Sequence, residues 1–313
     1  MALESDLLID RRRLKRGLAF WRAVAVVAVL GAVALVARDS GPAQSLLGPS
    51  VARLTVSGVI TADRERDSAL AAIAEDRNVR ALIVAIDSPG GTVSGGEALH
   101  RALSAVAARK PVVAVMGGTA ASAGYMVALP AERIFARDST VTGSIGVLMQ
   151  TTEFAGLLES LGIRAEALTS GPLKDQPSPF RPLTEEGRAA LNAVIQDLYA
   201  QFVAMVAAGR RMEVAQVRPL ADGRVFTGRQ AMAAGLVDAI GGEAEARAWL
   251  AAEKDVPATL PVREVVADEA DAFIPRLLRD ARKALVSERL NLDGLMAIWH
   301  PSLSGAGSRG TGQ

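Results

Sequence analysis

Several segments of the sequence combine small or glycine residues with a hydroxyl or an amine, the groups of an acyl-transfer site. Residues 117–125 (GGTAASAGY) place Ser122 among small residues, and residues 142–146 (TGSIG) hold Ser144 in a glycine turn. Lys174 follows in a loop with the sequence SGPLKD. A serine hydroxyl becomes a nucleophile when a neighbouring base takes its proton. Taken singly, these residues are more simply explained as a helix cap, a connecting loop and a solvated lysine.

The choice of base is limited because histidine occurs only twice, at His100 and His300, and cysteine is absent. Without cysteine there is no disulfide, thiolate metal site or cysteine nucleophile. His100 falls on a predicted helix and His300 lies near the C-terminus beside Pro301, and neither has glycine-rich surroundings. A lysine can replace histidine when burial lowers its pKa towards neutrality. Among the few lysines, only Lys174 lies in a loop with the turn residues of a site.

Each glycine-containing segment of this candidate site follows a predicted buried strand. The apolar run 81–86 (ALIVAI) is followed by 87–91 (DSPGG), and the run 111–116 precedes the Ser122 segment. Adjacent glycines let backbone N–H groups approach a ligand closely, as an oxyanion hole requires, although a tight strand-to-helix turn is the alternative. Together with a strand over 51–60 and intervening helices, these runs predict an α/β domain with a parallel sheet.

Two further helices are predicted after the candidate site. Residues 184–211 form a long helix with a period near 3.6, and we expect its apolar residues to pack in the core: Leu191, Val194, Ile195, Leu198, Phe202 and Met205. Residues 272–290 form an amphipathic helix with several arginines, which could pack on the domain, on a neighbouring subunit or on lipid.

The composition limits the class of protein. With 313 residues, 50% hydrophobic residues and a mean hydropathy of +0.24, the chain is folded or membrane-attached, and not disordered. The length fits one large domain or two smaller ones. A formal net charge of +1 leaves no global electrostatic footprint for nucleic acid.

The N-terminus predicts a membrane anchor. A basic cluster at residues 11–16 precedes the apolar run 18–37, whose only charge is Arg22. A helix of this length spans roughly 30 Å of hydrocarbon. Basic residues stay on the cytoplasmic side, so the rest of the chain lies outside the cytoplasm. A cleaved signal peptide is the alternative, and a twin-arginine signal around Arg11 and Arg12 is a looser match.

These patterns divide the chain into parts with different roles. The predicted parts are a cytoplasmic basic segment (1–17), a transmembrane anchor (18–37), a linker (38–50), a catalytic domain (51–250), a C-terminal amphipathic extension (251–300) and a disordered tail (301–313).

The order of the segments DSPGG, ASAGY, TGSIG and SGPLKD resembles the signal peptide peptidase SppA family, which belongs to the ClpP/crotonase-like superfamily. The resemblance covers residues 51–249 and includes 221–231 (ADGRVFTGRQA) and 235–238 (GLVD). It implies a repeated β-β-α superhelix with a mostly parallel sheet, preceded by one N-terminal transmembrane helix. The length and the single anchor are similar to the short form of the family.

The resemblance also implies a role for each candidate residue. Ser122 is the expected nucleophile, Lys174 the general base, and Ser144 the group that orients the lysine amine. The backbone N–H groups of Gly91 and Ala123 are the expected oxyanion hole. No metal or cofactor is expected in this mechanism.

The implied function is a serine endopeptidase that degrades released signal peptides and other small membrane-associated peptides. It would be anchored in the bacterial inner membrane with its N-terminus in the cytoplasm and its catalytic domain in the periplasm. The family forms a homo-oligomer, here expected as an octameric ring in which neighbouring subunits supply serine and lysine. A crotonase-like acyl-CoA enzyme and a non-catalytic scaffold of the same fold are the alternatives.

Overall fold

The computed structural model describes residues 21, 24, 48–265 and 296–298. The chain divides into two units, Met1–Pro49 and Ser50–Gln313, and the second contains the candidate site. The predicted basic segment, the anchor, most of the linker, the amphipathic helix, His300 and the tail lie outside the described residues.

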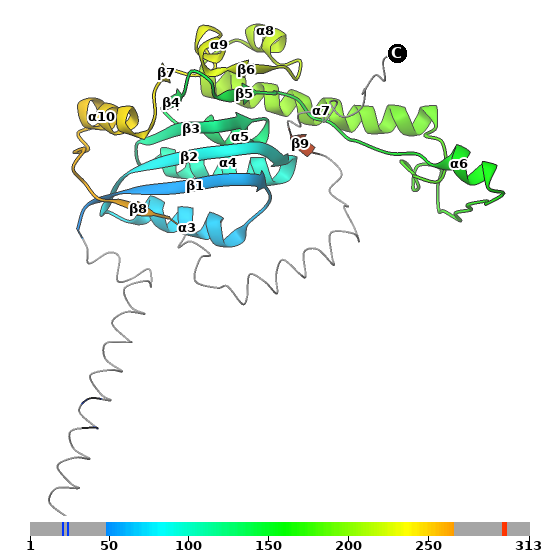
Figure 1. Cartoon of the computed structure of the whole chain (residues 1–313), viewed down its shortest axis with the longest axis horizontal. Helices are drawn as coiled ribbons and strands as arrows, with labels where there is room; N and C mark the ends of the chain where they lie inside the picture. The colour runs from blue at the N-terminus through cyan, green and yellow to red at the C-terminus, as the bar shows by residue number, and fades with distance from the viewer. Residues whose placement is uncertain (1–20, 22–23, 25–47, 266–295, 299–313) are drawn as a thin grey trace, which may run out of the picture. The chain divides into compact units, whose positions relative to one another are not determined.

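The domain is built on a nine-stranded sheet (Figure 1). Its longest strands, β1 (Ser50–Ile60), β2 (Val79–Thr92) and β3 (Val112–Ala121), lie side by side and run parallel. Connections through helices are the usual way to join parallel neighbours. Here α3 (Arg64–Glu75) joins β1 to β2, and α4 (Val93–Ala107) joins β2 to β3. The predicted α/β fold with a mostly parallel sheet is confirmed.

The remaining strands are short and extend the sheet on both sides. They are β4 (Arg133–Ala136), β5 (Val141–Gly143), β6 (Val225–Thr227), β7 (Ala239–Ile240), β8 (Val262–Glu264) and β9 (Met296–Ile298). The strand order along the main path is β6-β5-β3-β2-β1-β8, with β4 pairing β3 and β7. The β5–β6 and β2–β9 pairs are antiparallel, so the sheet is mixed. Because β8 pairs with β1, the folded unit continues beyond residue 250.

Both faces of the central strands are buried, which explains the continuous apolar run in β2. Leu82, Val84 and Ile86 face the main core, which also includes residues of α4, α5 (Ala123–Ala128) and α7 (Glu185–Arg210). Ala81 and Ile83 point to the other face, where they pack with residues of α10 (Glu243–Glu253). This alternation is the period of two that a strand imposes on its side chains.

The three longest described helices, α3, α4 and α7, begin at polar caps. The Asp63 carboxylate accepts hydrogen bonds from the first turn of α3, and the hydroxyls of Thr92 and Thr184 accept from the first turns of α4 and α7. Shorter helices complete the domain: α6 (Ala155–Ser160), α8 (Val214–Val217), η2 (Arg218–Leu220) and α9 (Gly228–Ala233).

The long helix α7 matches the predicted bounds, but the expected core packing holds only for its C-terminal half. Phe202 is buried, whereas Val194 is 46% exposed and Leu191 is half-buried. The N-terminal half runs past the edge of the sheet together with α6 (Figure 1), so this part of the domain offers it little to pack against. Among the described helices, α7 also has the length and mean hydropathy (1.3) to cross a membrane, a test that core helices of soluble proteins pass as well.

The strands that lead to the candidate site are longer than predicted. β2 continues through DSPGG to Thr92, and β3 continues through the GGT segment to Ala121. The segment 87–91 therefore belongs to β2 and is not a strand-to-helix turn, because Gly90 and Gly91 pair with Val59 and Ile60 of β1.

Candidate active site

Ser122 occupies a strained junction between β3 and α5. Its backbone has φ 56° and ψ −118°, a region that residues other than glycine rarely adopt. Its N–H donates to the Gly143 carbonyl at 2.8 Å, and its carbonyl accepts from the Met126 N–H at 2.9 Å. The side chain is 1% exposed and makes no capping hydrogen bond to α5. The explanation of Ser122 as a simple helix cap therefore fails.

Ser144 lies directly after β5 and also has a positive φ, of 49°. Its N–H donates to the carbonyl of Arg224 at 2.8 Å, which fixes the residue against the β6 side of the domain. Since Gly143 accepts the hydrogen bond from Ser122, both serines are held by one short stretch of backbone. The structure thus brings Ser122 and Ser144 into the same site.

The backbone N–H groups predicted for the oxyanion hole belong to Gly91, near the end of β2, and Ala123, at the start of α5. A Cβ on Gly91 would lie 1.9 Å from the carbonyl oxygen of Ile60, so only glycine allows this approach of β1 and β2. Ala123 is the first residue of α5, where an N–H has no intrahelical acceptor. The start of α5 packs on the end of β2, because a Cβ on Gly124 would lie 2.9 Å from the Ser88 carbonyl oxygen.

Lys174 is placed apart from this cluster. It is exposed in a turn in which its N–H donates to the Gly171 carbonyl at 3.2 Å. Within the described part of the chain, no hydrogen bond or ion pair joins Lys174 to Ser122 or Ser144. Lys174 belongs to residues 148–184, which include α6 and are called the protruding segment below (Figure 1).

The protruding segment exposes many large apolar side chains. No residue of α6 is buried. The exposed residues of the segment are Leu148, Phe154, Leu157, Leu161, Ile163, Leu168, Leu173 and Phe180, with exposed fractions of 41–95%. Such a concentration of exposed apolar side chains is typical of a surface that binds another protein or a ligand.

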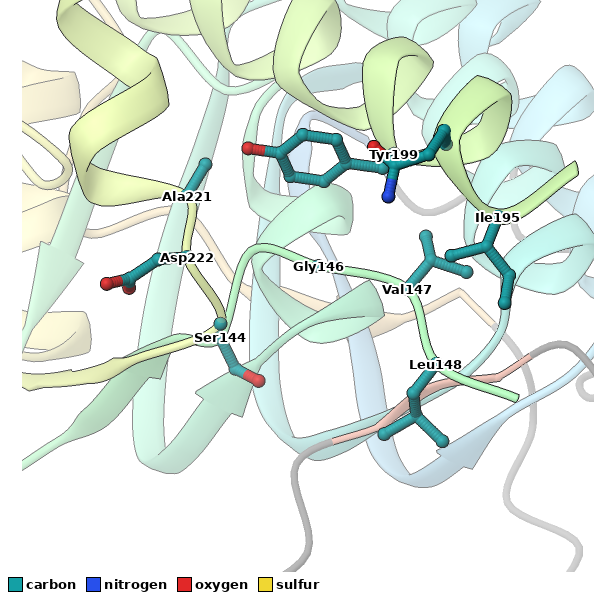
Figure 2. Close-up of a pocket in the computed structure, with 10 residues that line it drawn as sticks. Ser144, Gly146, Val147, Leu148, Ile195, Tyr199, Ala221 and Asp222 are labelled. Carbon is teal, nitrogen blue, oxygen red and sulfur yellow. The ribbon is translucent and has the colours of Figure 1, made fainter. Parts of the chain in front are cut away.

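A cavity of about 370 Å³ lies beside Ser144. Figure 2 shows Tyr199 and Ile195 projecting from α7 over the loop that carries Ser144 and Val147. The Asp222 carboxylate also lines the cavity but points away from the Ser144 hydroxyl (Figure 2). Hydrogen bonds from the Arg224 side chain and backbone lower the pKa of Asp222 to about 2. Asp222 is therefore ionised and paired with Arg224, and the rest of the lining mixes polar groups, such as Ser144 and Gln196, with apolar side chains such as Val147, Leu148 and Ile195.

The described residues offer few groups for the other common catalytic systems, a histidine base or a metal ion. His100 lies on α4, where burial lowers its pKa and favours the neutral imidazole. Its backbone carbonyl accepts a hydrogen bond from Ser104, and it has no hydrogen bond to Ser122 in this part of the chain. Among residues 48–265 and 296–298, no group of three or more histidine, cysteine or acidic side chains could hold a metal ion.

Two polar residues beside the site, Asp87 and Ser88, are not predicted to have a role from the sequence alone. The Asp87 carboxylate accepts a hydrogen bond from the Thr119 N–H of β3, and the Ser88 hydroxyl bonds to the backbone of Gly58 and Gly90. The sequence signal for them is their position, since two polar residues directly follow the apolar run 81–86. Their partners could not be known without the pairing of the strands.

Comparison with known proteins identifies the class. The sequence profile of peptidase family S49 matches residues 104–257, and that of Clp protease matches residues 60–143. A Synechocystis protein named as a candidate protease is 42% identical over 203 residues, covering 64% of this chain and 73% of that protein.

Two relatives carry more specific names. An Enterococcus faecium protein named as a candidate signal peptide peptidase SppA is 34% identical over 65% of this chain and 63% of its own length. The chloroplastic serine protease SPPA of Arabidopsis thaliana is 32% identical over 72% of this chain, but the match covers only 33% of that protein.

The fold and these matches define a serine-type protease with a ClpP-like α/β fold. The chain belongs to peptidase family S49, as an SppA-type member.

Proposed function

We propose that this protein is a membrane-anchored serine endopeptidase that uses a Ser122/Lys174 dyad to degrade released signal peptides and other small membrane-associated peptides. The observation that carries the proposal is the conformation of Ser122, which is strained, buried and free of a capping role at the junction of β3 and α5. Strained serines at strand-to-helix turns are typical of hydrolase nucleophiles. Membership of a peptidase family favours this function over the acyl-CoA enzyme and the scaffold.

In the proposed mechanism the neutral Lys174 amine takes the Ser122 hydroxyl proton while Oγ attacks the scissile carbonyl. The N–H groups of Gly91 and Ala123 stabilise the oxyanion that forms. The ammonium group then gives its proton to the leaving amine, which breaks the peptide bond and leaves an acyl-serine. Water, deprotonated by the same amine, hydrolyses this ester. Ser144 holds the amine in position.

The lysine of each site would come from a neighbouring copy of the chain. Lys174 is exposed on the protruding segment, whereas Ser122 is buried in the body of the domain. The exposed apolar residues of this segment would be covered in a ring of subunits, for which we propose an octamer.

The described strands support an extended mode of peptide binding. Strand β9 lies antiparallel to the end of β2, with Gly91 opposite Ala297 and Gly90 opposite Ile298. This edge therefore accepts an added strand beside the oxyanion glycine, as many peptide-binding proteins do. A substrate peptide and residues 296–298 cannot pair with the same edge together, so β9 would leave when a peptide binds. The cavity beside Ser144, with Val147, Leu148 and Ile195 in its lining, would take a small or apolar substrate side chain.

Substrate class and location rest on the relatives and on the N-terminal sequence. One relative is named for signal peptides. The basic cluster at residues 11–16 before the apolar run 18–37 supports an anchor in the bacterial inner membrane, with the N-terminus in the cytoplasm and the catalytic domain in the periplasm.

The test uses the full chain in detergent or lipid vesicles with a set of synthetic signal peptides. We expect Ser122→Ala and Lys174→Ala each to lower the cleavage rate on the order of 10³-fold or more, with unchanged folding and assembly. Lys254→Ala, on α10's C-terminal cap, is the matched lysine control and should retain activity. Near-wild-type cleavage by Ser122→Ala or Lys174→Ala would refute the dyad.

A further inference from the structure

We propose that Asp87 and Ser88 are positioning residues that together fix the oxyanion glycine Gly91 relative to the nucleophile Ser122. The proposal rests on the proposed function, since it concerns the same site. Both residues belong to β2, between β1, which carries the close contact to Gly91, and β3, which leads to Ser122 (Figure 1).

Ser88 ties the end of β2 to β1. Its side chain is fully buried, and its hydroxyl donates to the Gly58 carbonyl at 2.6 Å. The same oxygen accepts from the Gly90 N–H at 3.1 Å. The pairing of β1 and β2 changes register here, between Ser57 and Val59, so the regular ladder does not hold this part of the strand. The Ser88 hydroxyl replaces the missing ladder contacts immediately before Gly91.

Gly90 shows why such a tie is needed. Its φ of 116° lies in a region that only glycine adopts readily, and a glycine there loses much conformational freedom on folding. The hydrogen bond from its N–H to Ser88 selects one conformation out of many. This conformation sets the direction of the next peptide unit, which carries the Gly91 N–H.

Asp87 ties β2 to the strand of the nucleophile. Its carboxylate accepts a hydrogen bond from the Thr119 N–H at 2.9 Å. The β2–β3 ladder also changes register at this point, because Ile86 pairs with Met116 and Ser88 pairs with Ala120. The extra residues of β3 form a bulge, and bulges re-aim the chain that follows. The Asp87 carboxylate holds this bulge just before Ser122.

Asp87 and Ser88 are adjacent in β2, and their side chains bind the two strands that flank it: Ser88 bonds to β1 and Asp87 to β3. Ser88 fixes Gly90 and Gly91 against β1, and Asp87 fixes the bulge of β3 that precedes Ser122. An oxyanion donor works only when it lies within hydrogen-bond distance of the oxygen as charge develops. Loss of either tie would therefore weaken transition-state stabilisation more than substrate binding.

The test compares peptide cleavage by the full-length Ser88→Ala, Asp87→Ala and Asp87→Asn variants with wild type. We expect Ser88→Ala and Asp87→Ala to lower kcat roughly 10- to 100-fold with KM changed less than about twofold. A peptide boronate, which forms a tetrahedral adduct with the nucleophile, should bind these variants more weakly by the same factor as the loss in kcat/KM. Asp87→Asn keeps an acceptor oxygen and should restore most of the activity lost in Asp87→Ala.

Ser104→Ala is the matched control. It also removes a serine hydroxyl that donates to a backbone carbonyl, here that of His100 on α4, with Oγ 2.8 Å from the carbonyl oxygen. It should leave kcat and boronate binding unchanged. Because Asp87 is exposed, its variants keep the proposal testable if Ser88→Ala does not fold. The proposal is overturned if Asp87→Ala or a folded Ser88→Ala keeps wild-type kcat and boronate affinity. Activity retained in Ser122→Ala would instead overturn the proposed function.

Discussion

The backbone N–H of Ser122 donates a hydrogen bond of 2.8 Å to the carbonyl oxygen of Gly143. This bond joins the turn that carries Ser122, the proposed nucleophile, to the residue immediately before Ser144. The Ser144 N–H is in turn bound to the Arg224 carbonyl, so the β6 side of the domain supports both serines. The two serines are therefore held together by backbone hydrogen bonds, while Lys174, the proposed base, lies on the exposed protruding segment.

A mixing experiment tests whether neighbouring subunits share the dyad. Ser122→Ala and Lys174→Ala are each expected to be inactive alone. Co-expressed in equal amounts in a closed ring, they should restore about a quarter of the wild-type activity, because a site then receives its serine from one variant and its lysine from the other. Peptide cleavage by the purified mixed assembly is the measurement.

The control for this mixing experiment is the pair of variants purified separately and combined without subunit exchange. No activity in verified mixed rings would show that serine and lysine come from one chain.

The apolar side chains of the protruding segment should be needed for assembly. Leu161 is 64% exposed at the C-terminal cap of α6. A charge in an apolar interface is costly to bury, so Leu161→Glu should dissociate the oligomer and abolish cleavage together. Met232→Glu, on the exposed side of α9, is the control and should assemble normally. Sedimentation velocity measures the mass, and an intact, fully active Leu161→Glu oligomer would exclude this surface as the interface.

Gly91 should tolerate no side chain. A Cβ at this position would lie 1.9 Å from the Ile60 carbonyl oxygen, which is backbone and cannot move aside cheaply. Gly91→Ala should therefore lose about 10²-fold or more in kcat through displacement of the oxyanion donor, with a lower Tm. Gly242→Ala is the control, since its Cβ would meet only the Glu245 carboxylate, at 3.7 Å. Wild-type kcat in Gly91→Ala would show that this approach of β1 and β2 is not required.

The ion pair between Arg210 and Asp238 should make stability depend on pH. Arg210 Nη2 lies 2.6 Å from Asp238 Oδ1 and links the end of α7 to the sheet, where Asp238 also accepts from the Ile134 N–H. Burial by itself raises the pKa of Asp238, but the hydrogen bonds and charge of Arg210 outweigh burial and the pKa lies below its usual value. The stabilisation is therefore complete above about pH 4, the pKa in the unfolded chain, and is lost as pH falls through the lower pKa of the folded state.

Asp238→Asn should lower the free energy of unfolding by roughly 1–3 kcal/mol at pH 7, with a smaller difference from wild type at pH 3. Thermal unfolding followed by circular dichroism at both pH values measures this. Asp222→Asn, which removes an exposed pair with Arg224, should change Tm little at either pH. An equal loss of stability in Asp238→Asn at both pH values would contradict the role assigned to the ionised pair.

The sequence predicts the centre of the fold well because its strands are buried on both faces. The run 81–86 could be recognised since every residue of it had to be apolar. The continuation of β2 to Thr92 could not, because Gly90 and Gly91 have low strand propensity and belong to the strand only through their pairing with β1. Strand β9 was missed for a similar reason, since its partner lies far away in the sequence.

In the candidate site, too, local sequence predicts some residues, while others depend on contacts with distant strands. Ser122 and Ser144 were marked by small residues and glycines next to buried strands, and the structure places them together. The proposed role of Ser88 depends on its hydrogen bond to Gly58, a residue in another strand. The local sequence around Ser88 therefore could not predict this role. Val194 has the helical period of a core residue but is exposed, because periodicity identifies an apolar face without identifying what covers it.

The most direct measurement of the central claim is covalent labelling of the full-length protein with a fluorophosphonate, followed by peptide mapping in the mass spectrometer. The proposed nucleophile predicts one adduct on Ser122, formed at the same rate as peptide cleavage is lost, and no adduct in Ser122→Ala. An adduct on another serine that tracks the loss of activity, or unimpaired cleavage after complete modification of Ser122, would contradict it.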